Sequence, residues 1–182
     1  MSMYPIATWT ATADNQEQSF INIPQTFAHL QIRAFVKSPV ITGARSTNVD
    51  WTYMRFNGDA TPANYASHSL EGDGVTATSA SDATGVVSAF KSGVMPSSTS
   101  AAGFFGSLIV DIYDYTNTNK NKTFRALSGA DVNGAGIVSL RGGLWISTAA
   151  VTSIYLGGWS SGYKLGSRFD LYGVSNSPTA GV

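Results

Sequence analysis

The chain has 182 residues, of which 43% are hydrophobic and only 12% are charged. Eleven basic and eleven acidic residues give a formal net charge of zero, and there is no cysteine. This length suits a single domain with a substantial core. The balanced charge argues against a nucleic-acid partner, and the lack of cysteine excludes disulfides and thiol catalysis.

The N-terminal residues contain neither a basic segment nor a long apolar run, so no secretion signal is predicted. No window approaches the roughly 18 apolar residues that a membrane helix needs. We therefore expect a soluble, non-secreted protein without a membrane partner. A large β domain with so few charges is prone to associate, so we also expect it to belong to an assembly.

Short runs in which apolar and polar residues alternate predict strands through the first half of the chain. Residues 1–12 are expected to form an N-terminal arm or first strand, and residues 19–23 a short second strand. Residues 49–56 predict another strand, which ends at an Asn-Gly turn at residues 57–58. The longest alternation lies between residues 27 and 37, and its apolar face consists of Leu30, Ile32, Ala34 and Val36.

The composition then shifts to Ser, Thr, Ala and Gly over residues 75–103. This segment follows extended chain at residues 64–70 and a glycine-containing turn at residues 71–74. We predict a long surface excursion of the same domain, with weak strands such as residues 85–90, rather than a linker between two domains. Long loops inside a domain are uncommon and are often functional or bound by a partner.

A hairpin formed by residues 106–114 and 122–128 is expected to organise the fold. Its first strand alternates Leu108, Val110 and Ile112 with more polar positions. The Asn- and Thr-rich segment between the two runs has the composition of a turn. Burial of each aliphatic side chain would contribute roughly 1.5–3 kcal/mol, so Val110→Asp should destabilise the fold severely.

The second half of the chain continues as short strands. Residues 137–140 and 144–147 are expected to be two strands, separated by an Arg-Gly-Gly turn at residues 141–143. Residues 152–156 and 167–173 are the last two predicted strands. The residues of the final strand that we expect to face inward are Phe169 and Leu171.

Roughly ten short strands without helical periodicity predict an all-β fold. We expect an antiparallel two-sheet β-sandwich that is jelly-roll-like. Residues 13–174 would form this single domain, after the N-terminal arm or strand at residues 1–12. Residues 175–182 would form a flexible C-terminal tail.

The residue types needed for catalysis are scarce. A nucleophilic triad needs a base, which could only be His29 or His68. His29 lies on the polar face of its strand and His68 lies near a turn, so structural hydrogen bonds explain both better. The sequence alone leaves a carboxylate pair for glycoside hydrolysis open, although both Glu residues are expected to lie in turns. We therefore predict no catalytic residue and no enzyme.

No cofactor or metal site is predicted either. Asp111 and Asp114 lie three positions apart, and the segment that begins at Asp131 faintly resembles a calcium loop. That segment lacks the bidentate Glu of an EF-hand. Capping of turns by Asp and Asn is the better interpretation.

Three tryptophans are candidates for a sugar-binding platform, because aromatic faces stack on apolar sugar surfaces. They are Trp51, Trp145 and Trp159. Packing in the core or in interfaces is favoured for them as a group. Trp159, in a Gly- and Ser-rich loop, is the one that we expect to be exposed.

Several segments taken together resemble a family of small virion structural proteins of tailed bacteriophages. These segments are residues 22–33, 56–59, 64–74, 110–120, 143–154 and 169–173. The resemblance as a whole spans roughly residues 19–173. The resemblance implies a non-enzymatic β-sandwich that is built into the particle. Members of this family decorate heads or belong to fibres or tails, and no binding residue can be carried over from them.

The resemblance leads us to expect a capsid decoration (cement) protein, made in the host cytoplasm and located in the virion. It would be a homo-oligomer, with a trimer as our guess, and would contact the major capsid protein and other virion proteins. We expect its contacts at residues 1–12 and 75–103. The alternative is a tail fibre or baseplate module that recognises host surface glycans. A carbohydrate-active enzyme or its binding module fits least.

Overall fold

The computed structural model describes residues 2–40, 48–82, 88–159 and 161–175. These residues form two antiparallel sheets that pack against each other, so the predicted all-β sandwich is confirmed. The strands are β1 (Ser2–Thr10), β2 (Gln18–Phe20), β3 (His29–Val36), β4 (Val49–Phe56), β5 (Tyr65–Gly72), β6 (Ala77–Asp82), β7 (Phe90–Pro96), β8 (Gly106–Tyr113), β9 (Lys122–Asp131), β10 (Gly136–Trp145), β11 (Ile154–Gly158) and β12 (Arg168–Ser175).

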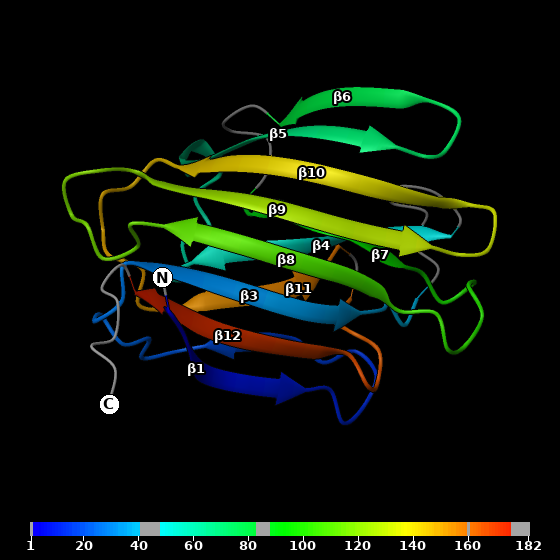
Figure 1. Cartoon of the computed structure of the whole chain (residues 1–182), viewed down its shortest axis with the longest axis horizontal. Helices are drawn as coiled ribbons and strands as arrows, with labels where there is room; N and C mark the ends of the chain where they lie inside the picture. Colours follow the sequence, from blue (N-terminus) through cyan, green and yellow to red (C-terminus); the bar gives the residue numbers. More distant parts are fainter. Residues whose placement is uncertain (1, 41–47, 83–87, 160, 176–182) are drawn as a thin grey trace.

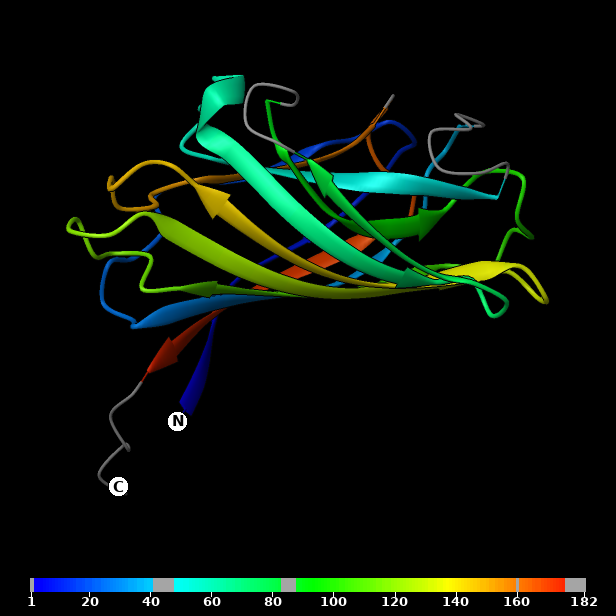
Figure 2. The same ribbon diagram turned by 90° about the horizontal axis from the view of Figure 1, so that it is seen from above.

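The larger sheet has eight strands in the order β1-β12-β3-β8-β9-β10-β5-β6, and the smaller has four in the order β2-β11-β4-β7 (Figure 1). Seen from above, the larger sheet is strongly curved, and β5 and β6 rise at its edge toward the smaller sheet (Figure 2). The main core lies between the sheets and combines aliphatic residues of the larger sheet with aromatic residues of both.

The strand pairing is nested. β1 pairs with β12, β2 with β11, β3 with β8 and β4 with β7. This is the pattern of a long hairpin that has been rolled up, which is the topology of a jelly roll. The remaining four strands are two insertions, β5–β6 after β4 and β9–β10 after β8, and both extend the larger sheet on the same side.

The predicted central hairpin is confirmed as β8 and β9, the two middle strands of the larger sheet. Leu108, Val110 and Ile112 are buried, whereas the side chain of Ile109 between them is 40% exposed. The turn is closed by buried Lys122, whose Nζ donates to three backbone carbonyls at 2.6–3.0 Å. The inward face predicted for residues 27–37 is also confirmed in β3.

The prediction of two short strands between residues 137 and 147 is wrong, because β10 is one continuous strand. The Arg-Gly-Gly segment has the composition of a turn, but each residue has a partner on a neighbouring strand. Arg141 is buried against Glu71 of β5. At Gly143 a Cβ atom would lie 2.0 Å from a ring carbon of Phe124 on β9, so the aromatic ring occupies the space that a side chain would need.

The segment of residues 75–103 is not a surface excursion. It forms the exposed strand β6 at the edge of the larger sheet and then the largely buried strand β7 of the smaller sheet. Its small residues permit close packing, since a Cβ atom at Gly93 would lie 2.8 Å from the hydroxyl of Ser128. Of the weak strand expected at residues 85–90, residues 85–87 lie outside the described part, and Phe90 begins β7.

The N-terminal segment forms an edge strand of the larger sheet and pairs along its length with β12. Trp9 of this strand packs on Phe169, with ring centroids 6.0 Å apart. Of the expected tail at residues 175–182, Ser175 ends β12, and residues 176–182 lie outside the described part. In the described residues the one helical element is the 3-10 turn η1 (Pro62–Asn64), and no helix is long and apolar enough to cross a membrane.

The crossover from β4 to β5 is fixed by Asp59. Its carboxylate accepts hydrogen bonds from the backbone N–H of Thr61, the side-chain amide of Asn64 and the indole N–H of Trp145, at 2.7–2.9 Å. The hydroxyl of Tyr65 donates to the backbone carbonyl of the same residue. Burial opposes ionisation, but the three hydrogen bonds outweigh it and lower the pKa of Asp59 to about 2.

This carboxylate should make stability depend on pH. The folded pKa lies below the ordinary value of 3.8, so its contribution is complete above that value and is lost as the pH falls toward 2. After allowance for solvent screening, we expect a loss of about 1–2 kcal/mol. Urea unfolding of the wild type and of Asp59→Asn between pH 2 and 7 measures it. The difference between their free energies of unfolding should shrink in acid, whereas a constant difference would contradict the role of the charge.

Candidate functional site

The two histidines lie far apart in the larger sheet. His29 is on β3 and His68 on β5, with β8, β9 and β10 between them. The Nδ1 atom of His29 accepts a hydrogen bond from the backbone N–H of Asp114, and its ring contacts the edge of Tyr113. His68 is exposed on the outer face of the sheet. The structure therefore assembles no triad around either of them within the described residues.

The acidic residues that the sequence singled out stabilise local structure. Asp111 pairs with Gln31 and Arg125 on the neighbouring strands. Asp114 pairs with Lys120, and Asp131 accepts a hydrogen bond from the backbone N–H of Asn133 in the β9–β10 turn. Among the residues that the structure describes, no group of three or more His, Cys, Asp or Glu could hold a metal ion.

The three candidate tryptophans do not form one platform. Trp51 is buried, with the guanidinium of Arg141 4.4 Å from its ring centroid. Trp145 is buried and donates its indole N–H to Asp59. Trp159 follows β11 and is 51% exposed, which agrees with the expectation for its loop.

A buried ionic network joins the β5–β6 edge of the larger sheet to the smaller one. Arg141 pairs with Glu71 at 2.5 Å and lies 3.9 Å from Asp82, and Asp82 pairs with Lys91 of β7 at 2.6 Å. The hydroxyl of Ser139 also donates to Glu71. The sequence carries no signal of this network, because its members come from four strands that are distant in the chain. It fixes the curved edge of the larger sheet against β7.

A row of aliphatic side chains crosses the outer face of the larger sheet. Its four residues are direct cross-strand neighbours on β5, β10, β9 and β8, and each is 40–56% exposed. We call this set the apolar row; it consists of Leu70, Leu140, Leu127 and Ile109. Contiguous exposed apolar surface of this kind often marks an interaction site.

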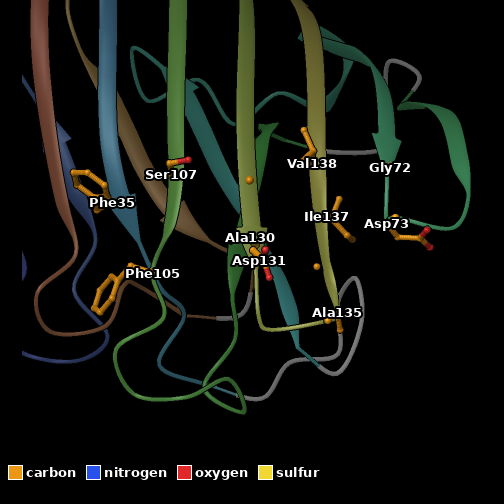
Figure 3. A pocket seen from close by; sticks show the side chains of 14 residues that line it. Phe35, Gly72, Asp73, Phe105, Ser107, Ala130, Asp131, Ala135, Ile137 and Val138 are labelled. Atoms are coloured by element: carbon orange, nitrogen blue, oxygen red, sulfur yellow. The ribbon is translucent and has the colours of Figure 1, made fainter.

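A groove of about 560 Å³ lies beside the apolar row. Figure 3 shows Phe35 and Phe105 on one side of it and Val138 on the other. Ser107 and Gly129 lie between them in direct cross-strand register. The groove is hollow because Ser107 and Gly129 have only small side chains. A Cβ atom added at Gly129 would approach nothing closer than 4.0 Å.

A second, smaller pocket of about 250 Å³ lies on the outer face of the smaller sheet. Arg55 of β4 and Tyr155 of β11 are direct cross-strand partners there, and the guanidinium lies 5.3 Å from the centre of the tyrosine ring. Tyr53 and Trp159 form the adjacent wall, with ring centroids 5.2 Å apart. Burial raises the pKa of Tyr155, and a hydrogen bond to Glu17 raises it further. We call this the aromatic–arginine pocket.

These observations define the chain as a β-sandwich with jelly-roll strand pairing, which has the apolar row on one outer face and the aromatic–arginine pocket on the other. No known protein family, curated protein or solved structure matches it. The pairing of Arg55 with Tyr155 could not be found from the sequence, since it depends on β4 pairing with β11. The apolar row did leave a signal, because β9 and β10 carry leucines on the face opposite the core.

Proposed function

We propose that the chain is a non-enzymatic virion structural protein, a capsid decoration (cement) protein. In this proposal the apolar row and the groove beside it bind other protein chains of the particle. The observation that carries the proposal is the apolar row itself. Four aliphatic side chains in register on four strands are uncovered, although the opposite face of the same strands is buried in the core.

The charge pattern of the outer face supports a protein partner. Several charged side chains there are paired with one another, as in the contacts of Arg125 with Asp111 and of Arg168 with Asp170. A nucleic acid would need unpaired basic side chains instead. The resemblance to phage virion proteins supports the same class of partner, and the decoration role that we propose makes the major capsid protein the partner within it.

The mechanism would be stabilisation by mass action. A protein that binds the assembled shell and not its separated subunits raises the free energy needed to rupture the shell. Covering the apolar row would contribute about 1 kcal/mol for each of its half-exposed side chains. The segments first expected to make contacts contain β1 and β6, the two end strands of the larger sheet. Contacts between copies along these edges would give the proposed homotrimer.

The test adds purified protein to particles that lack it and measures their resistance to heat. We expect the wild type to bind heads and raise the temperature of rupture, and Leu127→Asp to bind at least tenfold more weakly. Leu127 is half exposed, so its substitution should leave the melting temperature of the free protein almost unchanged.

Thr123→Asp is the matched control, because this exposed position lies on the same face of the same strand but outside the apolar row. It should bind as the wild type does. Electron microscopy of particles lacking the protein gives a second readout. Unchanged heads with missing density in the tail would refute the decoration role.

A further inference from the structure

The aromatic–arginine pocket has the features of a binding site that is separate from the apolar row. It lies on the outer face of the smaller sheet, whereas the apolar row lies on the outer face of the larger one. The position of Tyr155 in it depends on Gly157, where a Cβ atom would lie 2.4 Å from the tyrosine hydroxyl. Glycine at this position therefore lets the tyrosine ring lie along β11 beside Arg55.

Arg55 differs from the other partly or fully buried cations of this region. Arg141 and Lys91 each pair with a carboxylate. Among the described residues, Arg55 has no carboxylate within ion-pair distance, and its hydrogen bond from Nη2 to Ser88 is long, at 3.4 Å. Its Nε atom, like that of Arg141, is buried without a hydrogen-bond partner in that same set. A guanidinium held in this way is ready to receive an anion in bidentate geometry.

Two further aromatic side chains line the pocket, beside the small residues Ser88, Ala89 and Gly158. Trp159 is half exposed and lies against Tyr53, whose buried hydroxyl also has no partner among the residues that the structure describes. Buried donors are nearly always paired, so two of them around one pocket call for an explanation. Flat rings beside hydrogen-bond donors suit a ligand with one apolar face and a polar edge.

We propose that the aromatic–arginine pocket binds one carboxylated sugar residue, a hexuronate, of a surface polysaccharide. The carboxylate would pair with Arg55 and the apolar face of the sugar ring would stack on Trp159. The volume of about 250 Å³ lies below the range of sites for drug-sized ligands, which suits a single ring. The proposal does not depend on the decoration role, because the two surfaces share no residue.

The experiment titrates the full chain with four probes and measures binding by calorimetry and ligand-observed NMR. The probes are glucuronate, glucose, hyaluronan oligosaccharides and dextran oligosaccharides. We expect glucuronate and hyaluronan to bind at least tenfold more tightly than their neutral counterparts. Tighter binding of hyaluronan than of free glucuronate would identify a polysaccharide as the source. Equal affinity for hyaluronan and for free glucuronate would assign the pocket to the free sugar acid and overturn the polysaccharide part of the proposal.

Two variants test the assigned contacts. Arg55→Met should remove the preference for the acidic probes. Trp159→Ala should lower the affinity for acidic and neutral probes alike, by about tenfold. Arg125→Met, at an exposed arginine on the larger sheet, is the control and should bind as the wild type does. If Arg55→Met does not fold, the salt dependence of wild-type binding replaces it, since the affinity for glucuronate should fall with ionic strength.

Three results would overturn the proposal. The first is that neither acidic probe binds to the wild type, and the second is that acidic and neutral probes bind with equal affinity. The third is that folded Arg55→Met keeps the wild-type preference for acidic over neutral probes. Loss of glycan binding would leave the heat resistance of decorated particles unaffected. Failure of this inference can therefore be distinguished from failure of the decoration role.

Discussion

Val110→Asp is expected to prevent the chain from folding. Val110 lies on β8 in the middle of the larger sheet and is completely buried in the main core. The substitution removes roughly 1.5–3 kcal/mol of apolar burial and places a carboxylate among the apolar side chains of the main core, at a cost of several kcal/mol more. Together these approach the whole stability of an ordinary domain. Far-ultraviolet circular dichroism and the yield of soluble protein measure the outcome.

Ile109→Asp is the matched control, since it introduces the same charge at the next residue. The side chain of Ile109 points to the opposite, outer face and is 40% exposed. We expect it to fold with a free energy of unfolding within about 1 kcal/mol of the wild type. Similar damage from both substitutions would contradict the assignment of the two faces of β8.

Glu71→Ala is the second substitution from which we expect a large effect. Arg141 is only 3% exposed and forms its closest ion pair with Glu71. Removal of the carboxylate leaves the guanidinium buried beside Asp82, which is already engaged by Lys91. Breaking a buried pair on one side typically costs about 3–5 kcal/mol. Denaturant unfolding at neutral pH measures the loss.

Two further variants separate the pair from general damage. Glu71→Leu combined with Arg141→Met replaces both charges by apolar groups, and it should recover most of the lost stability. Arg125→Ala breaks an exposed pair on the outer face of the same sheet and should cost less than about 1 kcal/mol. A loss below 1 kcal/mol for Glu71→Ala would show that water reaches Arg141.

The sequence predicted well those strands that have one buried and one exposed face. In β3 and β8 the burial alternates at every residue, so the pattern of apolar side chains gave both the strand and its inward face. β10 was divided wrongly because its interior contains Arg141 and Gly143. Arg141 is buried against Glu71, and Gly143 lies against the ring of Phe124, contacts that only the folded sheet brings together.

The candidate surfaces were less accessible from the sequence. Exposure of Trp159 followed from its glycine-rich loop, but its neighbours Tyr53, Arg55 and Tyr155 come from two strands about a hundred residues apart. The apolar row requires the register of four strands. Alternation places a residue on a face, but it does not identify the residue beside it on the next strand.

The nested pairing of strands has a consequence for synthesis on the ribosome. β1 pairs only with β12 in the sheet order, and Ser2 lies opposite Ser175. β1 must therefore wait until β12 has been translated, and pairings over such separations form slowly. Until then the nascent chain exposes unpaired strand edges, which are prone to aggregate. Binding of a chaperone during translation should accordingly persist until residues 168–175 have left the exit tunnel.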